Sequence, residues 1–246
     1  MTLAQILSPP PPHWRDASLF LDFDGTLVEL AETPDAVIVD RALIALLTQV
    51  AARLPGRVAI VSGRSIAQLD DFFGDALSSL AVSGSHGAER RVPGVTASAA
   101  VAPGGLDAAS DALAGYARAN GIVFERKTLG AGLHYRAAPA AQDAARAFAQ
   151  GLAAEHDLVV QHGKMMVELR APGDKGQAVA ALMETPAMRG TRPLVFGDDV
   201  TDEDGFAAAV KLGGAGVLVG EPRETAAAYA LADVAALREW LAGVTT

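Results

Sequence analysis

The chain has no cysteine, only four lysines beside sixteen arginines, and few aromatic residues, which make up 5% of its 246 residues. The absence of cysteine excludes disulfides, thiolate metal ligands and a cysteine nucleophile. There is also no run of about eighteen uncharged apolar residues, so we expect no membrane span. Met1 to Asp16 has no basic segment leading into an apolar core, so we expect no signal peptide and a cytoplasmic protein.

The charge balance is acidic: 20 basic residues stand against 29 acidic ones, a net charge of −9. Affinity for a phosphate backbone needs clustered lysine and arginine, so we expect no nucleic-acid partner. Half of the residues are apolar and only 20% are charged, which excludes a disordered protein. The length allows one or two domains, and the preference for alanine and arginine is typical of a GC-rich bacterial genome.

Short apolar runs alternate with segments of helical periodicity over most of the chain. Strands are predicted at 18–21, 57–61, 80–83, 193–196 and 216–219, and helices at 43–54, at 65–73, from Lys175 and from Thr201. This alternation predicts an α/β fold, a Rossmann-like parallel sheet with helices on both faces. In such a sheet ligands bind beyond the carboxyl ends of the strands, so polar residues that follow the strands are candidates for the site.

The pattern changes in the middle of the chain. A helix is predicted at 106–120, strands at 122–127 and 132–137, a second helix at 140–155, and strands at 158–161 and 164–170. This αββαββ order predicts a small α+β unit inserted into the core. We therefore expect three segments: 1–102, the first part of the core with a proline-rich lead-in at 1–16; 103–171, the inserted cap domain; and 172–246, the second part of the core.

The motif Asp22-Phe23-Asp24-Gly25-Thr26 follows the first predicted strand. Two carboxylates at i and i+2 leave a strand on the same side, and the glycine lets the chain turn away sharply. One carboxylate could attack phosphorus while the other handles the proton of the leaving group. A capped turn is the alternative, since Asp and Gly are favoured turn residues. The apolar run before the motif and the threonine after it favour the catalytic interpretation.

Two further motifs lie at the ends of predicted core elements. Ser62-Gly63-Arg64 ends the second strand, where a hydroxyl and backbone N–H groups could hold a phosphoryl oxygen. An ordinary helix N-cap is the alternative there. Gly173-Asp174-Lys175-Gly176 opens a helix, where a lysine opposes the helix dipole. This conflict indicates that the Lys175 ammonium is needed elsewhere, for example between carboxylates and phosphate, with a solvated lysine as the alternative.

The segment Gly197 to Asp204 follows the predicted strand 193–196 and holds five acidic residues in its last seven positions. The helix dipole stabilises acids at a helix start, but Asp198 and Asp199 precede the expected cap at Thr201. Carboxylates without a histidine–cysteine ligand set favour a hard divalent cation, Mg²⁺ rather than Zn²⁺.

Together and in this order, the four motifs resemble the haloacid dehalogenase-like phosphatase superfamily. The resemblance implies that Asp22 is the nucleophile and forms an aspartyl-phosphate, and that Asp24 protonates the leaving alcohol and then activates water. It implies that Ser62 and Lys175 bind the transferring phosphoryl group. It also implies a Mg²⁺ ion on Asp22, the backbone carbonyl of Asp24, and Asp198, with Asp199 and Asp202 in support.

Longer strings resemble the trehalose-6-phosphate phosphatases of that superfamily: Phe20 to Leu27 with Pro34-Asp35 downstream, Val61 to Arg64, Ser85-His86-Gly87-Ala88-Glu89, and Gly197 to Glu203. The resemblance covers roughly residues 18–240, including the predicted cap. It implies Mg²⁺-dependent hydrolysis of trehalose 6-phosphate to trehalose and phosphate, the last step of trehalose biosynthesis. We expect a small-molecule substrate and a monomer.

Charged residues fall at alternate positions of the predicted cap strands. Alternation places Glu125 with Lys127, His134 with Arg136, and Lys164 with Glu168 on shared faces. A solvated face of an antiparallel sheet would look the same, but three of the four lysines are Lys127, Lys164 and Lys175. The resemblance implies that Glu125, Lys127 and Glu168 bind sugar hydroxyls, and that Arg136 and Lys164 lie near the phosphate or help to close the cap. Further substrate contacts are expected from Gly25, Arg64 and His86.

Two alternatives stay open. The same chemistry could act on another sugar phosphate, such as sucrose 6-phosphate or glucosylglycerol phosphate, or could serve a phosphohexomutase. The chain could also be a catalytically silent relative that binds a sugar phosphate as a sensor. The presence of Asp22, Asp24, Lys175 and Asp198 argues against a silent relative.

Overall fold

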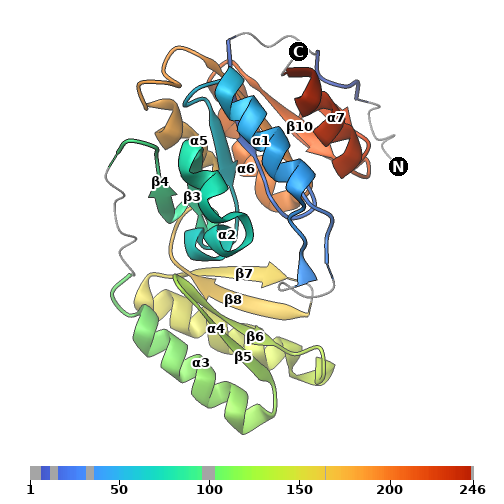
Figure 1. Ribbon diagram of the computed structural model, residues 1–246. Coiled ribbons are helices and arrows are strands. Elements are labelled where there is room, and N and C mark those ends of the chain that lie inside the picture. The colour runs from blue at the N-terminus through green and yellow to red at the C-terminus, as the bar shows by residue number, and fades with distance from the viewer. Residues whose placement is uncertain (1–6, 12–15, 32–35, 96–102, 164, 245–246) are drawn as a thin grey trace. The chain divides into compact units, whose positions relative to one another are not determined.

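The computed structural model describes residues 7–11, 16–31, 36–95, 103–163 and 165–244. The chain divides into two compact units, one of Met1–Ser98 with Gly173–Thr246 and one of Ala99–Pro172. The first is an α/β core and the second a smaller α+β unit (Figure 1). The borders expected from the sequence, 102/103 and 171/172, lie four residues and one residue from these. That the two units are separate domains stays a prediction.

A seven-stranded sheet forms the middle of the core, in the order β11-β10-β9-β1-β2-β3-β4. Its strands are β1 (Ala17–Leu21), β2 (Val58–Val61), β3 (Ala81–Gly84), β4 (Glu89–Arg91), β9 (Arg192–Gly197), β10 (Ala215–Val219) and β11 (Tyr229–Leu231). Neighbouring strands are parallel, which confirms the predicted α/β sheet, except that β4 runs antiparallel to β3. β4 and β11 were not predicted, because each has only three residues and β4 reads Glu-Arg-Arg, without an apolar alternation.

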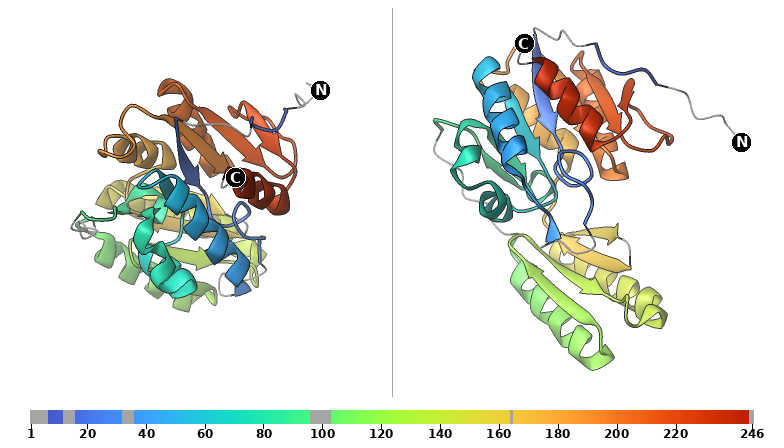
Figure 2. Two further views of the ribbon diagram at one scale, coloured as in Figure 1. Left: turned by 45° about the horizontal axis from the view of Figure 1, so that its top comes forward. Right: turned by 45° about the vertical axis from the view of Figure 1, so that its right-hand side comes forward.

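Helices cover both faces of this sheet. On one face α1 (Arg41–Arg53), α2 (Ile66–Phe73) and α7 (Val234–Val244) share an apolar cluster with the strands. On the other face lie α5 (Lys175–Met183) and α6 (Glu203–Lys211). The views in Figure 2 show α1 and α7 side by side along the sheet. The predicted two-sided covering is confirmed, although α7 was not predicted.

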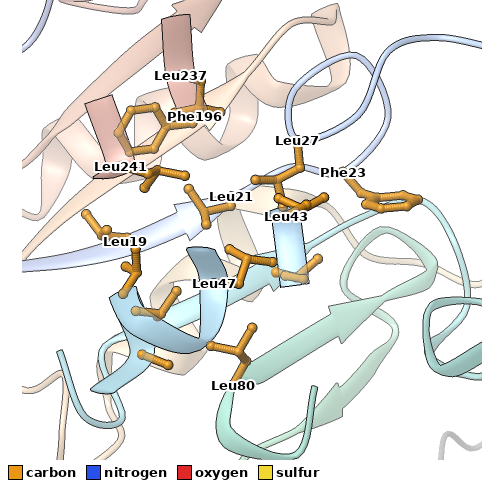
Figure 3. Close-up of a cluster of buried hydrophobic side chains, with 14 of the residues drawn as sticks. Leu19, Leu21, Phe23, Leu27, Leu43, Leu47, Leu80, Phe196, Leu237 and Leu241 are labelled. Atoms are coloured by element: carbon orange, nitrogen blue, oxygen red, sulfur yellow. The ribbon is translucent and has the colours of Figure 1, made fainter. Parts of the chain in front are cut away.

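The alternation of side chains along β1 explains how this strand joins both layers. Leu19 and Leu21 lie in the cluster of α1 and α7, whereas Phe20, between them, packs toward α5 and α6. Figure 3 shows the first of these clusters, with leucines from two helices around β1: Leu43 and Leu47 of α1, and Leu237 and Leu241 of α7. Each buried leucine stabilises the packing by about 1.5–3 kcal/mol. The end of β1, which carries the Asp22 motif, is therefore firmly placed.

The helices near the site are capped at their N-termini by residues other than the candidate catalytic ones. Ser65 caps α2, and its Oγ accepts a hydrogen bond of 3.2 Å from the Gln68 N–H. The N-cap alternative for Ser62 is therefore wrong. Asp174 caps α5, with 2.7 Å between its Oδ1 and the Gln177 N–H. The helix expected from Thr201 begins at Glu203, after a 3-10 turn, η5 (Val200–Asp202), that Asp199 caps.

The second unit is a four-stranded antiparallel sheet with two helices on one face (Figure 1). The strands are β5 (Val123–Lys127), β6 (Gly130–His134), β7 (Val159–Gly163) and β8 (Met166–Arg170), in the order β5-β6-β8-β7. The helices are α3 (Leu106–Asn120) and α4 (Gln142–His156), whose buried leucines and alanines pack on the sheet. The predicted αββαββ order is confirmed.

One strand of this unit is displaced from its expected place. The strand expected at 132–137 occupies 130–134 instead. The chain turns there because the Tyr135 carbonyl accepts a hydrogen bond of 3.0 Å from the Ala138 N–H. Arg136 therefore lies exposed in a turn, and the expectation that it shares a strand face with His134 is wrong. Lys164 lies outside the described residues.

Part of the proline-rich lead-in lies against the core. The Ser8 carbonyl accepts a hydrogen bond of 3.1 Å from the Ala230 N–H, and the Pro10 carbonyl accepts one of 3.1 Å from Trp240 Nε1. Among the described residues, we find no helix with the length and apolar character needed to cross a membrane.

Candidate active site

Asp22 and Lys175 form the centre of a buried charged cluster at the carboxyl end of the core sheet. Asp22 directly follows β1, and its backbone N–H donates a 3.0 Å hydrogen bond to the Phe196 carbonyl of β9. Lys175 Nζ donates to Asp22 Oδ1 at 2.7 Å and to Asp202 Oδ1 at 2.6 Å. All three residues are at most 6% exposed. The solvated-lysine alternative is therefore wrong, and the ammonium at the start of α5 serves two carboxylates.

A third carboxylate, that of Asp198, completes a group that could hold a metal ion. Asp22, Asp198 and Asp202 each offer a carboxylate oxygen within 4.8 Å of the others. Thr26 Oγ1 donates to Asp198 Oδ1 at 3.1 Å. Gly25 has a φ of +78°, and a Cβ there would lie 2.2 Å from Asp198 Oδ2. The glycine is therefore needed for the close approach of Asp198, in addition to the turn itself.

The cluster carries more negative than positive charge. Burial raises the pKa of Asp22 well above its usual value, with Lys175 opposing and Asp202 adding to the rise. Burial, and then the charge of Asp202, raise the pKa of Asp198 to about 6. Burial alone lowers the pKa of Lys175, but Asp22 and Asp202 outweigh it and raise the pKa overall, so the ammonium stays charged. Three carboxylates around one ammonium suit a hard cation, which binds oxygen ligands.

The carboxylates differ in how freely they could serve as ligands. Both oxygens of Asp202 accept hydrogen bonds, Oδ1 from Lys175 at 2.6 Å and Oδ2 from the Asp199 N–H at 3.0 Å. Asp22 and Asp198 therefore offer the more available oxygens. That these two residues and the Asp24 carbonyl hold the ion stays a prediction. Asp202 serves first to hold Lys175, and Asp199 lies exposed as the cap of η5.

Asp24 has a different environment from Asp22, although only one residue separates them. Arg64 Nε donates to Asp24 Oδ2 at 2.7 Å, and Arg64 Nη2 donates to Oδ1 at 2.8 Å. The Asp24 side chain is 32% exposed. One carboxylate of the motif is thus buried against an ammonium and the other is partly open beside a guanidinium, an arrangement that suits two carboxylates with different chemical roles.

The segment that carries Ser62 and Arg64 is held by a turn, η3 (Ser85–Gly87). The Ser62 carbonyl accepts from the His86 N–H at 3.0 Å, and the Arg64 carbonyl accepts from the Ser85 N–H at 2.8 Å. Ser85 and His86 have φ values of 49° and 54°, in the left-handed region that non-glycine residues seldom adopt. The His86 ring packs on Gly63, where a Cβ would lie 2.5 Å from its Nε2. The strained backbone of Ser85 and His86 persists only where the surrounding structure holds it in place.

Two residues that fix these loops were given no role from the sequence. Buried Glu89 accepts hydrogen bonds on Oε2 from Ser85 Oγ at 2.9 Å and from the Ile66 N–H at 2.8 Å, which ties the turn to the start of α2. Arg223 donates to the Asp198 carbonyl at 3.3 Å and to the Asp199 carbonyl at 2.7 Å. Glu89 belongs to the segment 85–89 that resembles the family, so the sequence did indicate that this residue matters. Arg223 stands alone in a polar loop, and the sequence gives no signal for it.

The candidate sugar-binding residues lie together on one face of the sheet in the second unit. Lys127 forms an ion pair with Glu168, and His134 Nε2 lies 2.8 Å from Glu125 Oε2. β6 runs between β5 and β8, and it places Gly130 and Gly132 opposite Lys127 and Glu168. Because these glycines have no side chain, Lys127 can reach Glu168 across β6. Glu168 is only 6% exposed, which a fully solvated sheet face, the alternative considered for these charged residues, does not explain.

Known proteins are similar to this chain in sequence and in fold. Residues 20–235 match the family described as trehalose-phosphatase. The chain is 40% identical to the "Probable trehalose-phosphate phosphatase" of Sinorhizobium fredii strain NGR234, over 83% of this chain and 78% of that protein. It is 36% identical to the trehalose-6-phosphate phosphatase of Escherichia coli K12, over 92% and 86%. A solved structure of a trehalose-6-phosphate phosphatase related protein is similar with a TM-score of 0.72 and 27% identity, over 91% and 94% of the two chains.

Proposed function

The chain belongs to the trehalose-phosphatase family, and we propose that it hydrolyses trehalose 6-phosphate to trehalose and inorganic phosphate with Mg²⁺ as cofactor. The observation that carries this proposal is the buried Asp22–Lys175 pair beside Asp198 and Asp202, within the part of the chain that matches the family. We place the reaction in the cytoplasm and in a monomer, as the last step of trehalose biosynthesis.

The buried cluster suits nucleophilic attack on phosphorus. Lys175 fixes the orientation of the Asp22 carboxylate, and Asp22 attacks the phosphoryl group to form an aspartyl-phosphate. The bond from phosphorus to the sugar oxygen breaks, and that oxygen takes a proton from Asp24. Asp24 then accepts a proton from the water that attacks the aspartyl-phosphate, which releases phosphate and restores Asp22. Proton balance is complete over the two steps.

Positioning and charge neutralisation supply most of the catalysis in phosphoryl transfer. Mg²⁺, when bound, neutralises charge on the phosphoryl oxygens, and Asp22, Asp198 and the backbone carbonyl of Asp24 are the residues that would hold it. The Lys175 ammonium and the Ser62 hydroxyl are donors for the same oxygens. Ser62 is 1% exposed and its Oγ accepts from the Arg64 N–H at 3.1 Å, so its hydroxyl proton remains to be donated.

We assign sugar recognition to Glu125, Lys127 and Glu168 of the second unit. Sugar hydroxyls both donate and accept hydrogen bonds, and carboxylates beside an ammonium offer both kinds of partner. His86, Arg136 and Lys164 remain candidates for further substrate contacts. Gly25 acts through Asp198, as described above.

Phosphate release from a panel of substrates tests the proposed function. Trehalose 6-phosphate, sucrose 6-phosphate, glucosylglycerol phosphate and glucose 6-phosphate are compared with and without Mg²⁺. We expect trehalose 6-phosphate to exceed the others in kcat/KM by at least about tenfold, and all turnover to need Mg²⁺. Preference for another phosphate would change the assigned substrate, and binding without turnover would favour a sensor.

The substitution Asp22→Asn tests the mechanism. It should abolish turnover while the far-UV circular dichroism and the urea midpoint stay close to those of the parent chain. Asp40→Asn is the matched control, because Asp40 caps α1 through an acceptor oxygen and asparagine is an equally good cap. Robust turnover by Asp22→Asn would exclude the aspartyl-phosphate.

A further inference from the structure

Arg64 makes a two-point contact with Asp24. Its Nε donates to Oδ2 at 2.7 Å and its Nη2 to Oδ1 at 2.8 Å. Two parallel N–H···O bonds fix both the separation and the relative plane of the guanidinium and the carboxylate. The Arg64 side chain is 11% exposed and that of Asp24 is 32% exposed. The guanidinium is thus almost enclosed, while the carboxylate is open on part of its surface.

The guanidinium is itself fixed by its surroundings. Its central carbon, Cζ, lies 4.9 Å from the ring centroid of Phe72 and 5.5 Å from that of Phe23. The Phe23 ring is fully buried and packs 5.7 Å from Phe72, centroid to centroid. The Arg64 backbone donates to Ser62 Oγ at 3.1 Å and accepts from Ser85 at 2.8 Å. A guanidinium stacked on two rings and bonded in the plane has little freedom to turn toward a ligand.

We propose that Arg64 is a positioning residue, which acts on the reaction through Asp24, and that it is not a ligand of the substrate phosphate. This inference replaces the expectation drawn from the sequence, and it rests on the proposed function, in which Asp24 transfers the protons. The two hydrogen bonds use two of about four lone-pair sites of the carboxylate, so sites remain for proton transfer. Without Arg64, the partly exposed Asp24 side chain would sample rotamers that do not face the reacting oxygen.

Steady-state kinetics of the full chain with Mg²⁺ separate the two roles. For Arg64→Ala we expect kcat for trehalose 6-phosphate to fall about 10²-fold, the range of a misplaced general acid and base. A residue that acts only through Asp24 leaves ground-state binding intact, so KM and the inhibition constant for inorganic phosphate should stay within about threefold. Arg64→Lys keeps the charge but loses the planar fork, so its kcat should stay at least about tenfold below the parent.

Chemical rescue gives a readout that a merely structural role would not move. Millimolar guanidinium ion should restore part of the kcat of Arg64→Ala, and the same concentration of sodium ion should not. Arg91→Ala is the matched control, because Arg91 of β4 also makes a two-point contact with an aspartate: its Nη1 and Nη2 donate to Asp70 of α2 at 2.8 and 2.7 Å. Its kcat should equal that of the parent, with no response to guanidinium.

A double-mutant cycle tests the coupling to Asp24. In an Asp24→Asn background, Arg64→Ala should lower kcat no further, because the residue on which it acts has already lost its function. A further loss as large as in the parent would overturn the inference. So would an unchanged kcat with a raised KM and a raised phosphate inhibition constant in Arg64→Ala, which would make Arg64 a phosphate ligand. If Arg64→Ala does not fold, Arg64→Lys and its combination with Asp24→Asn decide the same question.

Failure of the proposed function has a different signature. The unsubstituted chain would then release no phosphate from trehalose 6-phosphate. The Arg64 comparisons would in that case be made with p-nitrophenyl phosphate, whose hydrolysis also needs the water-activating step that we assign to Asp24.

Discussion

Lys175 Nζ lies 2.7 Å from Asp22 Oδ1, although 153 residues separate the two in sequence. The lysine belongs to the first turn of α5 and the aspartate to the end of β1, so the contact joins the two parts of the core that the inserted unit separates. Asp202 is the second partner of the same ammonium, at 2.6 Å. The nucleophile proposed for the reaction therefore depends on charge balance inside a buried cluster.

Replacing Lys175 by methionine should lower both stability and activity. The substitution keeps the aliphatic stem but leaves the buried carboxylates of Asp22 and Asp202 without their cation. Removing one partner of a buried ion pair costs about 3–5 kcal/mol, so we expect a loss of this size in urea unfolding without divalent cations, and no turnover. Lys211→Met is the control, since Lys211 is exposed at the end of α6; its loss should stay below about 1 kcal/mol. Equal stability of the two variants would contradict the charge-balance argument.

Gly25→Ala should weaken Mg²⁺ binding through a steric effect on Asp198. A Cβ at Gly25 would lie 2.2 Å from Asp198 Oδ2, so this carboxylate would have to move. The left-handed backbone alone costs an alanine about 1–2 kcal/mol, and Gly213→Ala is the control for this cost. Gly213 has a φ of +77°, against +78° at Gly25, and among the described residues nothing lies within 4 Å of a Cβ there.

Both glycine variants should therefore lose similar stability from the backbone, but only Gly25→Ala should lose activity. A Mg²⁺ titration of phosphate release measures the difference. If Gly25→Ala reaches half-maximal rate at the Mg²⁺ concentration of the parent, Asp198 does not hold the ion in the way proposed.

Much of the fold could be predicted from the sequence, because the hydrophobic periodicity and the length of a segment distinguish helices from strands. The strand expected at 18–21 and the helices expected at 43–54 and 106–120 show clear apolar patterns, and the structure has them at 17–21, 41–53 and 106–120. β4 and β11 could not be found this way, since three residues are too short to show a period. The strand expected at 132–137 was misplaced, because its end depends on the hydrogen bond that closes a turn at Tyr135.

The candidate site, too, could be predicted only in part. Asp22, Lys175 and Asp198 were predicted because each stands at the end of a strand or the start of a helix, in an order that resembles a known superfamily. The partners of these residues were harder to find. Glu89, Arg223 and the pairing of Arg64 with Asp24 depend on loops that the fold brings together from distant positions. No local pattern in the sequence records such contacts.

The pH dependence of Mg²⁺ binding follows from the raised pKa of Asp198. Its usual value is 3.8 and burial raises it to about 6, so between these values the folded metal-free protein holds a proton that the unfolded chain has released. The stability contributed by this group is complete below 3.8 and is lost as the pH rises through about 6. Asp22, whose pKa is also raised, acts in the same direction.

A divalent cation takes the place of these protons, so its stabilising effect should grow as the pH rises. We expect the increase in Tm on adding Mg²⁺ to be small near pH 5 and large near pH 7, which lie about one unit below and above the raised pKa of Asp198. Asp198→Asn should flatten this dependence, because the amide does not titrate. A Mg²⁺-induced shift in Tm that is equal at both pH values would show that protons and metal do not compete at this cluster.

Lys127→Met tests the assignment of sugar recognition to the sheet of the second unit. A hydrogen bond to a charged group is worth about 1.5–3 kcal/mol, so its loss should raise KM for trehalose 6-phosphate by at least about tenfold. The rate with p-nitrophenyl phosphate, which carries no sugar hydroxyl, should not change. Because the same substitution leaves the buried Glu168 without its ion pair, the unit itself could lose stability. The variant Lys127→Met with Glu168→Gln removes the unpaired charge and should still show the raised KM.

Arg126→Met is the matched control for this experiment, since Arg126 neighbours Lys127 on β5 but points to the opposite face of the strand. It pairs with Asp107 and Asp111 on α3, at the surface of the same unit. Its loss should therefore cost less than about 1 kcal/mol of stability and leave KM unchanged. If Lys127→Met and Arg126→Met gave the same KM as the parent, the polar face that contains Glu125, Lys127 and Glu168 would not contact the sugar, and substrate choice would have to be sought in the core.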